Sequence, residues 1–218
     1  MAAAEDVETV PRDRRWSRWF NGWRLTVLLI VVVAFFTITA AVQLGGVDGA
    51  NRGIRLTART SLVLFLSAFT ASSLYHLWPT PATKWIRRNR RYLGVAFAGS
   101  HFIHAGFIVT TIVLNAHRFD IGFERTPKFV YVVDTFGYLS IIAMTITSFD
   151  PIARKMKYAN WKRLHLSGSY IIWFTFFFAY WRRGVAAPEF YGLLLLACIA
   201  ALIIRFIAKS QLQRARRH

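Results

Sequence analysis

The sequence predicts an all-α integral membrane protein, a bundle of six transmembrane helices with both termini in the cytoplasm. Three observations predict it: long apolar blocks, basic clusters between those blocks, and an uneven division of basic residues between alternate loops. The chain has 218 residues, of which 55% are hydrophobic and 17% are charged. A soluble domain carries about 25% charged residues. We therefore expect a multi-pass protein of the cell (inner) membrane, with lipid around it.

Six apolar runs are long enough to cross a bilayer as helices. About 20 residues, rising 1.5 Å each, cover a hydrocarbon core of about 30 Å. Helices are expected rather than strands, because a single helix satisfies its own backbone hydrogen bonds inside lipid. The expected spans are residues 25–42, 60–78, 92–116, 129–149, 164–181 and 190–207. Arg205, near the end of the last run, is expected to reach the membrane surface with its long side chain.

The basic residues predict the orientation. The N-terminal segment, the second loop, the fourth loop and the C-terminal end carry five Lys or Arg each, whereas the other loops carry three, three and two. Because cytoplasmic segments are enriched in Lys and Arg, both termini are placed in the cytoplasm. We divide the chain into an amphipathic cytoplasmic segment (1–23), a six-helix membrane domain (24–208) and a basic cytoplasmic tail (209–218). The net charge of +18 then comes from basic cytoplasmic segments that orient the protein and attract anionic lipid. No nucleic-acid partner is expected.

Histidines inside the apolar runs are the candidate functional residues. His101 and His104 lie within the third run, His117 lies at its outer end, and His165 opens the fifth. Ionisable groups inside a membrane are rare and are often functional. A neutral imidazole is the commonest metal ligand in proteins, although each of these histidines could instead form hydrogen bonds between helices.

The residues around these histidines favour haem iron over zinc. Zinc needs three or four converging donors, and besides histidine the runs offer only Asp134 and Cys198. Haem iron needs one or two axial ligands and an apolar cavity, which a helix bundle supplies. We therefore expect His104 and His165 to ligate one haem b, with His101 as a reserve ligand. His104 lies roughly 20 Å along its helix from the preceding arginines and His165 roughly 3 Å from its own, so their depths are expected to differ.

Asp134 is the other polar residue that stands out in the expected spans. A buried carboxylate needs a partner, and Arg59 is a candidate for a structural ion pair, while a role in proton or quinone chemistry is the alternative. No Gly-x-Gly-x-x-Gly motif follows an expected strand. Reduced nicotinamide and flavin chemistry would therefore come from a separate cytoplasmic flavin reductase, and the chain would be an electron-transfer subunit of an oxidoreductase without a catalytic domain of its own.

Two motifs carry a resemblance to a known family. The segment Arg90–Gly94 is followed by His104 ten residues beyond the glycine, and Thr147-Ser148 precedes the segment Trp161–His165. Together these motifs resemble the YedZ/MsrQ family, the haem-binding membrane subunits of a periplasmic methionine sulfoxide reductase system. That family belongs to the ferric-reductase-like transmembrane superfamily. The resemblance covers residues 53–181 and implies a six-helix bundle with cytoplasmic termini.

The resemblance also implies a function and a ligand set. His104 and His165 match the family's haem ligands, and electrons would pass from a cytoplasmic flavin reductase or a quinone toward an outer-side acceptor such as a methionine sulfoxide reductase. A bound FMN or quinone is a further expectation. The family has another histidine on the fifth helix, where this chain has Phe178, so the outer haem that His117 could serve lacks its second ligand and one haem is expected. The alternative is a haem-free membrane transporter, or an assembly or scaffold protein.

Overall fold

The computed structural model describes residues 20–116 and 126–215. These residues form helices and no strand, and five of the helices are long and apolar enough to cross a membrane. The prediction of an all-α, multi-pass membrane protein is thereby confirmed. The five candidate spans are α2 (Gly22–Leu44), α3 (Gly46–Leu77), α5 (Arg90–Leu114), α7 (Lys128–Ile146) and α10 (Pro188–Ala215).

Three further helices complete the described chain: α4 (Pro81–Arg88), α8 (Asp150–Ala153) and α9 (Tyr158–Ala186). The fifth apolar run of the sequence forms α9, but α9 is not among the five candidate spans. Basic residues lie near both of its ends and aromatic residues fill its middle. The sixth run forms α10, which is a candidate span and continues as helix to Ala215, into the expected tail. His117 and residues 1–19 of the expected amphipathic segment lie outside the described residues.

The first loop is much shorter than the sequence predicts. Residues 43–59 are expected to lie between two spans, but α3 begins at Gly46. Gly45 and Gly46 make the turn with φ of +67° and +51°, a region of backbone conformation that glycine adopts without a steric penalty. The apolar pattern marks the part of α3 that suits lipid, not the start of the helix. Arg55 and Arg59 therefore lie on α3 rather than in a loop.

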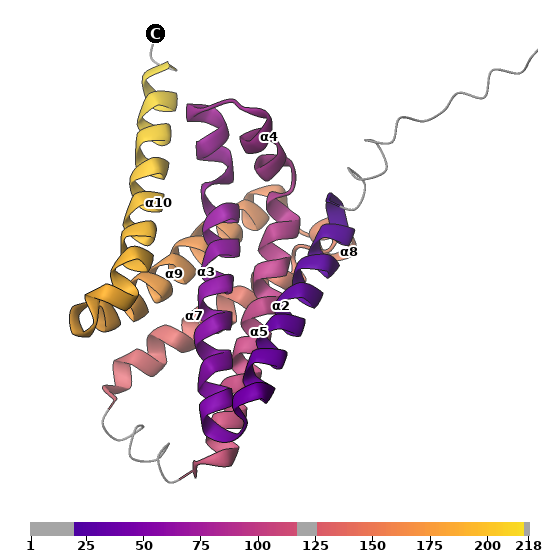
Figure 1. Ribbon diagram of the computed structural model, residues 1–218. Coiled ribbons are helices and arrows are strands. Elements are labelled where there is room, and N and C mark those ends of the chain that lie inside the picture. The colour runs from indigo at the N-terminus through magenta and orange to yellow at the C-terminus, as the bar shows by residue number, and fades with distance from the viewer. Residues whose placement is uncertain (1–19, 117–125, 216–218) are drawn as a thin grey trace, which may run out of the picture.

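Helix α3 is the central element of the bundle. It packs against α2, α4, α5 and α10, while α9 packs against α7 and α10. Figure 1 shows α2, α3 and α5 running side by side, with α7 and α9 crossing obliquely behind them. The buried core joins α3, α5, α7, α9 and α10 through Phe65, Phe97, Ile141, Phe176 and Cys198.

The two ends of the bundle differ. Helix α4, the start of α2 and the end of α10 lie at one end, which we call the α4 end (Figure 1). The turn between α2 and α3 lies at the other, which we call the turn end (Figure 1). At the α4 end, the buried Asn89 accepts a hydrogen bond from the Gly22 backbone N–H (3.1 Å) and donates to Asn21 Oδ1 (2.9 Å). The junction of α4 and α5 thus holds the start of α2.

Candidate functional site

Two cavities follow one another along the bundle. The turn-end cavity has a volume of about 440 Å³, and the α4-end cavity has a volume of about 530 Å³. Both volumes fall in the range of about 300–1,000 Å³ that small-molecule and cofactor sites occupy. Ile141 and Ile172 line both cavities, so the two adjoin at these side chains.

The predicted ligands lie in different cavities. His101 and His104 line the turn-end cavity, whereas His165 lines the α4-end cavity. The difference in depth expected from their positions along the helices is therefore present. Neither cavity is lined by both His104 and His165, and a single haem bound by both would have to extend past Ile141 and Ile172. The structure thus brings His101 and His104 together and keeps His165 apart from them.

The ring of His104 is held from one side. Its Nδ1 lies 3.1 Å from the Ile54 carbonyl oxygen and 3.0 Å from Thr57 Oγ1. A carbonyl oxygen only accepts, so Nδ1 carries the ring proton and donates it. The Thr57 hydroxyl itself donates to the Gly53 carbonyl at 2.6 Å. Nε2 of His104 therefore keeps its lone pair on a ring that lines the turn-end cavity.

His101 stacks on His104 from the preceding turn of α5. Their ring centroids are 5.0 Å apart with an interplanar angle of 20°, and the ring of Tyr138 lies 5.2 Å from that of His101. Two rings stacked along one side of a helix cannot bind opposite faces of the same haem. Nδ1 of His101 is buried without a hydrogen-bond partner, so this ring retains an unused polar group beside the cavity.

The turn-end cavity also contains charged groups. Asp134, Arg59 and Arg183 all line it, but no ion pair joins Asp134 to Arg59 in the described part of the chain, where the ion pair is Arg91–Asp150. The predicted pair therefore shares a cavity without a direct contact. Tyr138, which lies four residues after Asp134, also lines this cavity and is not among the residues predicted from the sequence. The i, i+4 spacing places both on one helix face and could have identified it.

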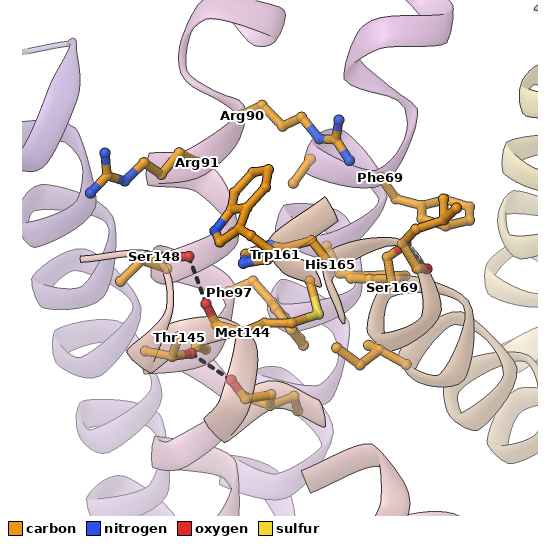
Figure 2. Close-up of a pocket in the computed structure, with 18 of the residues that line it drawn as sticks. Phe69, Arg90, Arg91, Phe97, Met144, Thr145, Ser148, Trp161, His165 and Ser169 are labelled. Atoms are coloured by element: carbon orange, nitrogen blue, oxygen red, sulfur yellow. Dashed lines mark hydrogen bonds between the residues drawn. The ribbon is translucent and has the colours of Figure 1, made fainter. Parts of the chain in front are cut away.

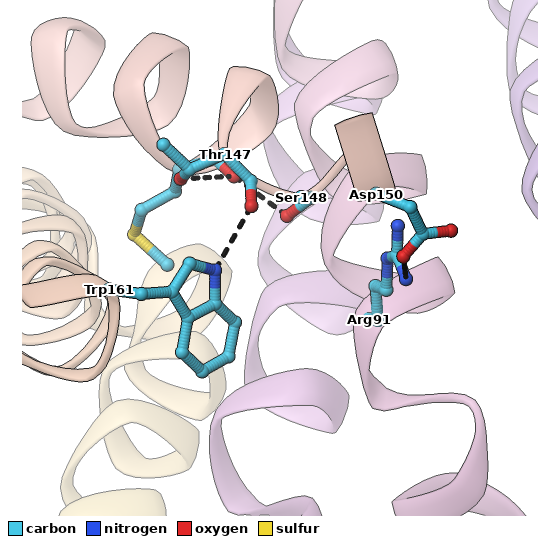
Figure 3. A network of polar contacts seen from close by, with 6 residues as sticks. Arg91, Thr147, Ser148, Asp150 and Trp161 are labelled. Carbon is cyan, nitrogen blue, oxygen red and sulfur yellow. Dashed lines mark hydrogen bonds and ion pairs between the residues drawn. The ribbon is translucent and has the colours of Figure 1, made fainter. Parts of the chain in front are cut away.

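The α4-end cavity brings together the two sequence motifs that contain Thr147 and His165. His165 Nε2 lies 3.0 Å from Thr147 Oγ1, and that hydroxyl donates to the Ala143 carbonyl at 2.7 Å. Thr147 must then accept from His165, so the proton sits on Nε2. Trp161 stacks on His165 at 4.2 Å and donates through Nε1 to the Thr147 carbonyl at 3.0 Å (Figures 2 and 3). Ligation of iron through Nε2 of His165 would require the bond to Thr147 to break.

Basic side chains surround this second cavity. Arg90, Arg91, Lys162 and Arg205 line it (Figure 2 labels the first two). Arg205 contacts α3: its Nη1 donates to the Phe69 carbonyl at 2.6 Å, and its guanidinium lies 4.1 Å from the centroid of the Phe69 ring. The sequence did not predict this contact, because position along one helix does not tell which neighbouring helix a long side chain contacts.

Residues 20–116 and 126–215 contain no group of three His, Cys, Asp or Glu side chains that could hold a metal ion by themselves. Haem iron is different because the porphyrin supplies four of its ligands and a protein needs to add one or two. No protein-family model matches the chain, and no curated protein matches it.

Proposed function

We propose that this chain is a multi-pass membrane electron carrier that binds one b-type haem in the turn-end cavity, with His104 Nε2 as the axial ligand. The observation that carries the proposal is the way His104 is held. A histidine that ligates a metal usually donates its other ring N–H to a carbonyl or carboxylate, which fixes the tautomer and the ring orientation. His104 donates in this way to the Ile54 carbonyl, beside Thr57.

The walls of the turn-end cavity suit a large, mostly apolar ring. Ile108, Phe176 and Tyr138 contribute apolar and aromatic surface, and Arg59 and Arg183 contribute positive charge, which suits carboxylates such as the haem propionates. The haem supplies a one-electron redox centre, and the chain supplies the ligand, the orientation and the burial.

We expect only α5 to supply a histidine ligand to the haem iron. The part of α9 that lines the turn-end cavity contains no histidine, and Phe178 replaces the histidine of the resembling family. His101 is the reserve ligand, because it lines the same cavity and has a free ring nitrogen. Pairing of His104 with His165 on one iron finds no support in the arrangement of the two cavities.

We extend the proposal to topology, with α9 as the sixth span and both termini in the cytoplasm. Two observations support it: the start of α2 and the end of α10 lie at the same end of the bundle (Figure 1), as an even number of crossings requires, and α9 packs against both α7 and α10. The α4 end, rich in Lys and Arg, would then face the cytoplasm of the cell that carries this protein in its inner membrane.

The donor and acceptor are proposed from the resemblance to the YedZ/MsrQ family. Electrons would come from a cytoplasmic flavin reductase or a quinone and would leave to an outer-side redox protein such as a methionine sulfoxide reductase. Exposed basic residues on α4, among them Lys84, Arg87 and Arg88, offer a docking surface for an acidic flavoprotein. Bound FMN belongs to the same proposal.

The test is an absorption spectrum of the detergent-purified chain after haem supplementation, with and without reductant. We expect a b-type Soret band that His104→Ala abolishes and that His165→Ala retains. His76→Ala is the matched control, because His76 is exposed on α3 and lines neither cavity. A wild-type chain without the band would overturn the proposal and leave a haem-free transporter or scaffold as the better description. Loss of the band in His165→Ala alone would place the haem in the other cavity.

A further inference from the structure

The α4-end cavity combines several cations with no carboxylate. Of the side chains that line it, Arg90, Arg91, Lys162 and Arg205 are basic, and none is Asp or Glu. Asp150 pairs with Arg91 from outside this lining, with 2.8 Å between Arg91 Nη1 and Asp150 Oδ1. The charge of the other three cations is not balanced by an ion pair within the described chain, so the cavity has a positive potential.

Two of these cations contact the same stretch of α3. Arg205 on α10 donates to the carbonyl of Phe69, and Arg90 on α5 lies 3.4 Å from the Ser72 hydroxyl oxygen. Phe69 and Ser72 are three residues apart on α3, so they lie about one turn apart on one face. Two guanidinium groups are therefore attached to the same stretch of α3 from different helices. The two positive charges repel each other, and an anion bound between them would offset that repulsion.

The remainder of the cavity is mostly apolar. Phe65, Phe97, Ile141 and Ile172 also line it, and all four are buried. Thr145 on α7, Ser148 in the turn after α7 and Ser169 on α9 add hydroxyl groups to the lining (Figure 2). A small inorganic anion would satisfy the guanidinium groups and leave this apolar surface unfilled. A ligand with a phosphate group and an apolar chain matches both parts.

We propose that the α4-end cavity binds one anionic phospholipid, with its phosphate against Arg90, Arg205 and Lys162 and part of an acyl chain against Phe65 and Phe97. Basic pockets between membrane helices are known to bind anionic lipid head groups, and a membrane supplies such a lipid at high local concentration. None of the basic side chains of this site lines the turn-end cavity, so the lipid site does not depend on haem bound at His104.

The test uses the full chain in detergent and three probes: phosphatidylglycerol, phosphatidylcholine with the same acyl chains, and inorganic phosphate. Binding is measured by native mass spectrometry and by the shift of the thermal unfolding midpoint. We expect one phosphatidylglycerol to bind saturably and raise the midpoint, while the other two probes have little effect. Equal effects of the two lipids would overturn the anionic site, and an equal effect of inorganic phosphate would show a free-phosphate site instead of a lipid site.

Lys162→Gln is the variant of choice, because Lys162 is exposed and makes no hydrogen bond or ion pair in the described chain that its loss would break. We expect it to weaken phosphatidylglycerol binding roughly fivefold, in line with about 1 kcal/mol per basic residue. Lys155→Gln is the matched control, since Lys155 is exposed, lies seven residues earlier in the chain and does not line the cavity. Equal weakening by both substitutions would reduce the effect to general surface charge and would overturn the site.

Discussion

Arg91 Nη1 on α5 donates a 2.8 Å hydrogen bond to Asp150 Oδ1 at the start of α8 (Figure 3). The Arg91 guanidinium also lies 5.4 Å from the ring centroid of Trp23 on α2, and Trp23 stacks on Phe149 at 5.0 Å. These contacts connect three segments of the chain at the α4 end: the start of α2, the start of α5 and the turn that follows α7.

The first prediction concerns the pH dependence of this ion pair. The hydrogen bond from Arg91 lowers the pKa of the Asp150 carboxyl below its ordinary value. A lowered folded-state pKa means that the stabilisation is complete above the unfolded pKa of about 3.9 and is lost as the pH falls through the folded pKa. Asp150→Asn is therefore expected to lower the thermal midpoint slightly at pH 7, where the carboxylate is 54% exposed.

The check is to compare wild type and Asp150→Asn from pH 7 down to pH 3 in an acid-stable detergent. The difference between their midpoints should shrink below about pH 4. A difference that stays constant over this range would mean that the carboxylate charge is not what stabilises the contact.

The second prediction concerns Asn89, which is 1% exposed. Besides its bonds to Gly22 and Asn21, its side chain donates to the Trp85 carbonyl at 3.1 Å. Asn89→Leu removes these bonds and leaves buried polar groups without partners, which costs about 1–3 kcal/mol for each group left unsatisfied. We expect a lower unfolding midpoint and faster proteolysis near residue 20. Asn160→Leu, at an exposed position of α9, should leave both measurements unchanged.

Much of the fold could be predicted because a membrane restricts the possibilities. The apolar runs located every long helix, since a chain in lipid must satisfy its own backbone. The run that became α9 is the instructive case. The helix itself was predicted correctly. It is not among the candidate spans, because basic residues at its ends and Trp and Tyr in its middle lower its hydropathy.

The site was predicted only where it depends on positions along one helix. The rise per residue predicted the different depths of His104 and His165. Contacts across helices could not be read in this way. The bond between Asn89 and Gly22 joins residues 67 positions apart, and the contact of Arg205 with Phe69 depends on where α10 packs against α3.

The third prediction concerns the close approach of α2 and α3 behind their turn. A Cβ added at Gly49 would collide with the backbone carbonyl oxygen of Ala41, and a backbone atom cannot move aside as a side chain can. Gly49→Ala is therefore expected to destabilise the protein by about 1–3 kcal/mol, the usual range for overpacking.

Gly106→Ala is the matched control for that substitution. Gly106 lies inside α5 and a Cβ there meets nothing within 4 Å, so alanine should be neutral or stabilising by about 0.5–1 kcal/mol. Thermal unfolding in one detergent compares the two variants. Equal stability of both would show that α2 and α3 are farther apart at Gly49 than the described contact.

The fourth prediction tests whether Thr57 fixes His104 as a ligand. Thr57 is fully buried, at 0% exposed, and Thr57→Val keeps its shape while removing the hydroxyl that accepts from Nδ1. The Ile54 carbonyl still accepts, so the ring should remain in place but be held less firmly. Loss of such an outer partner weakens metal binding about 10–100-fold, and we expect a value near the lower limit.

Titration of haem into the purified variants, followed at the Soret band, measures the change. Thr110→Val is the control, because the Thr110 hydroxyl bonds only to the Gly106 carbonyl of its own helix and the residue does not line the turn-end cavity. Equal haem affinity of Thr57→Val and wild type would show that the hydroxyl does not orient the ligand. In either case Thr57→Val should lower the stability of the haem-free protein by about 0.5–1.5 kcal/mol. The substitution removes one of the hydrogen bonds between α3 and α5 whether or not iron binds.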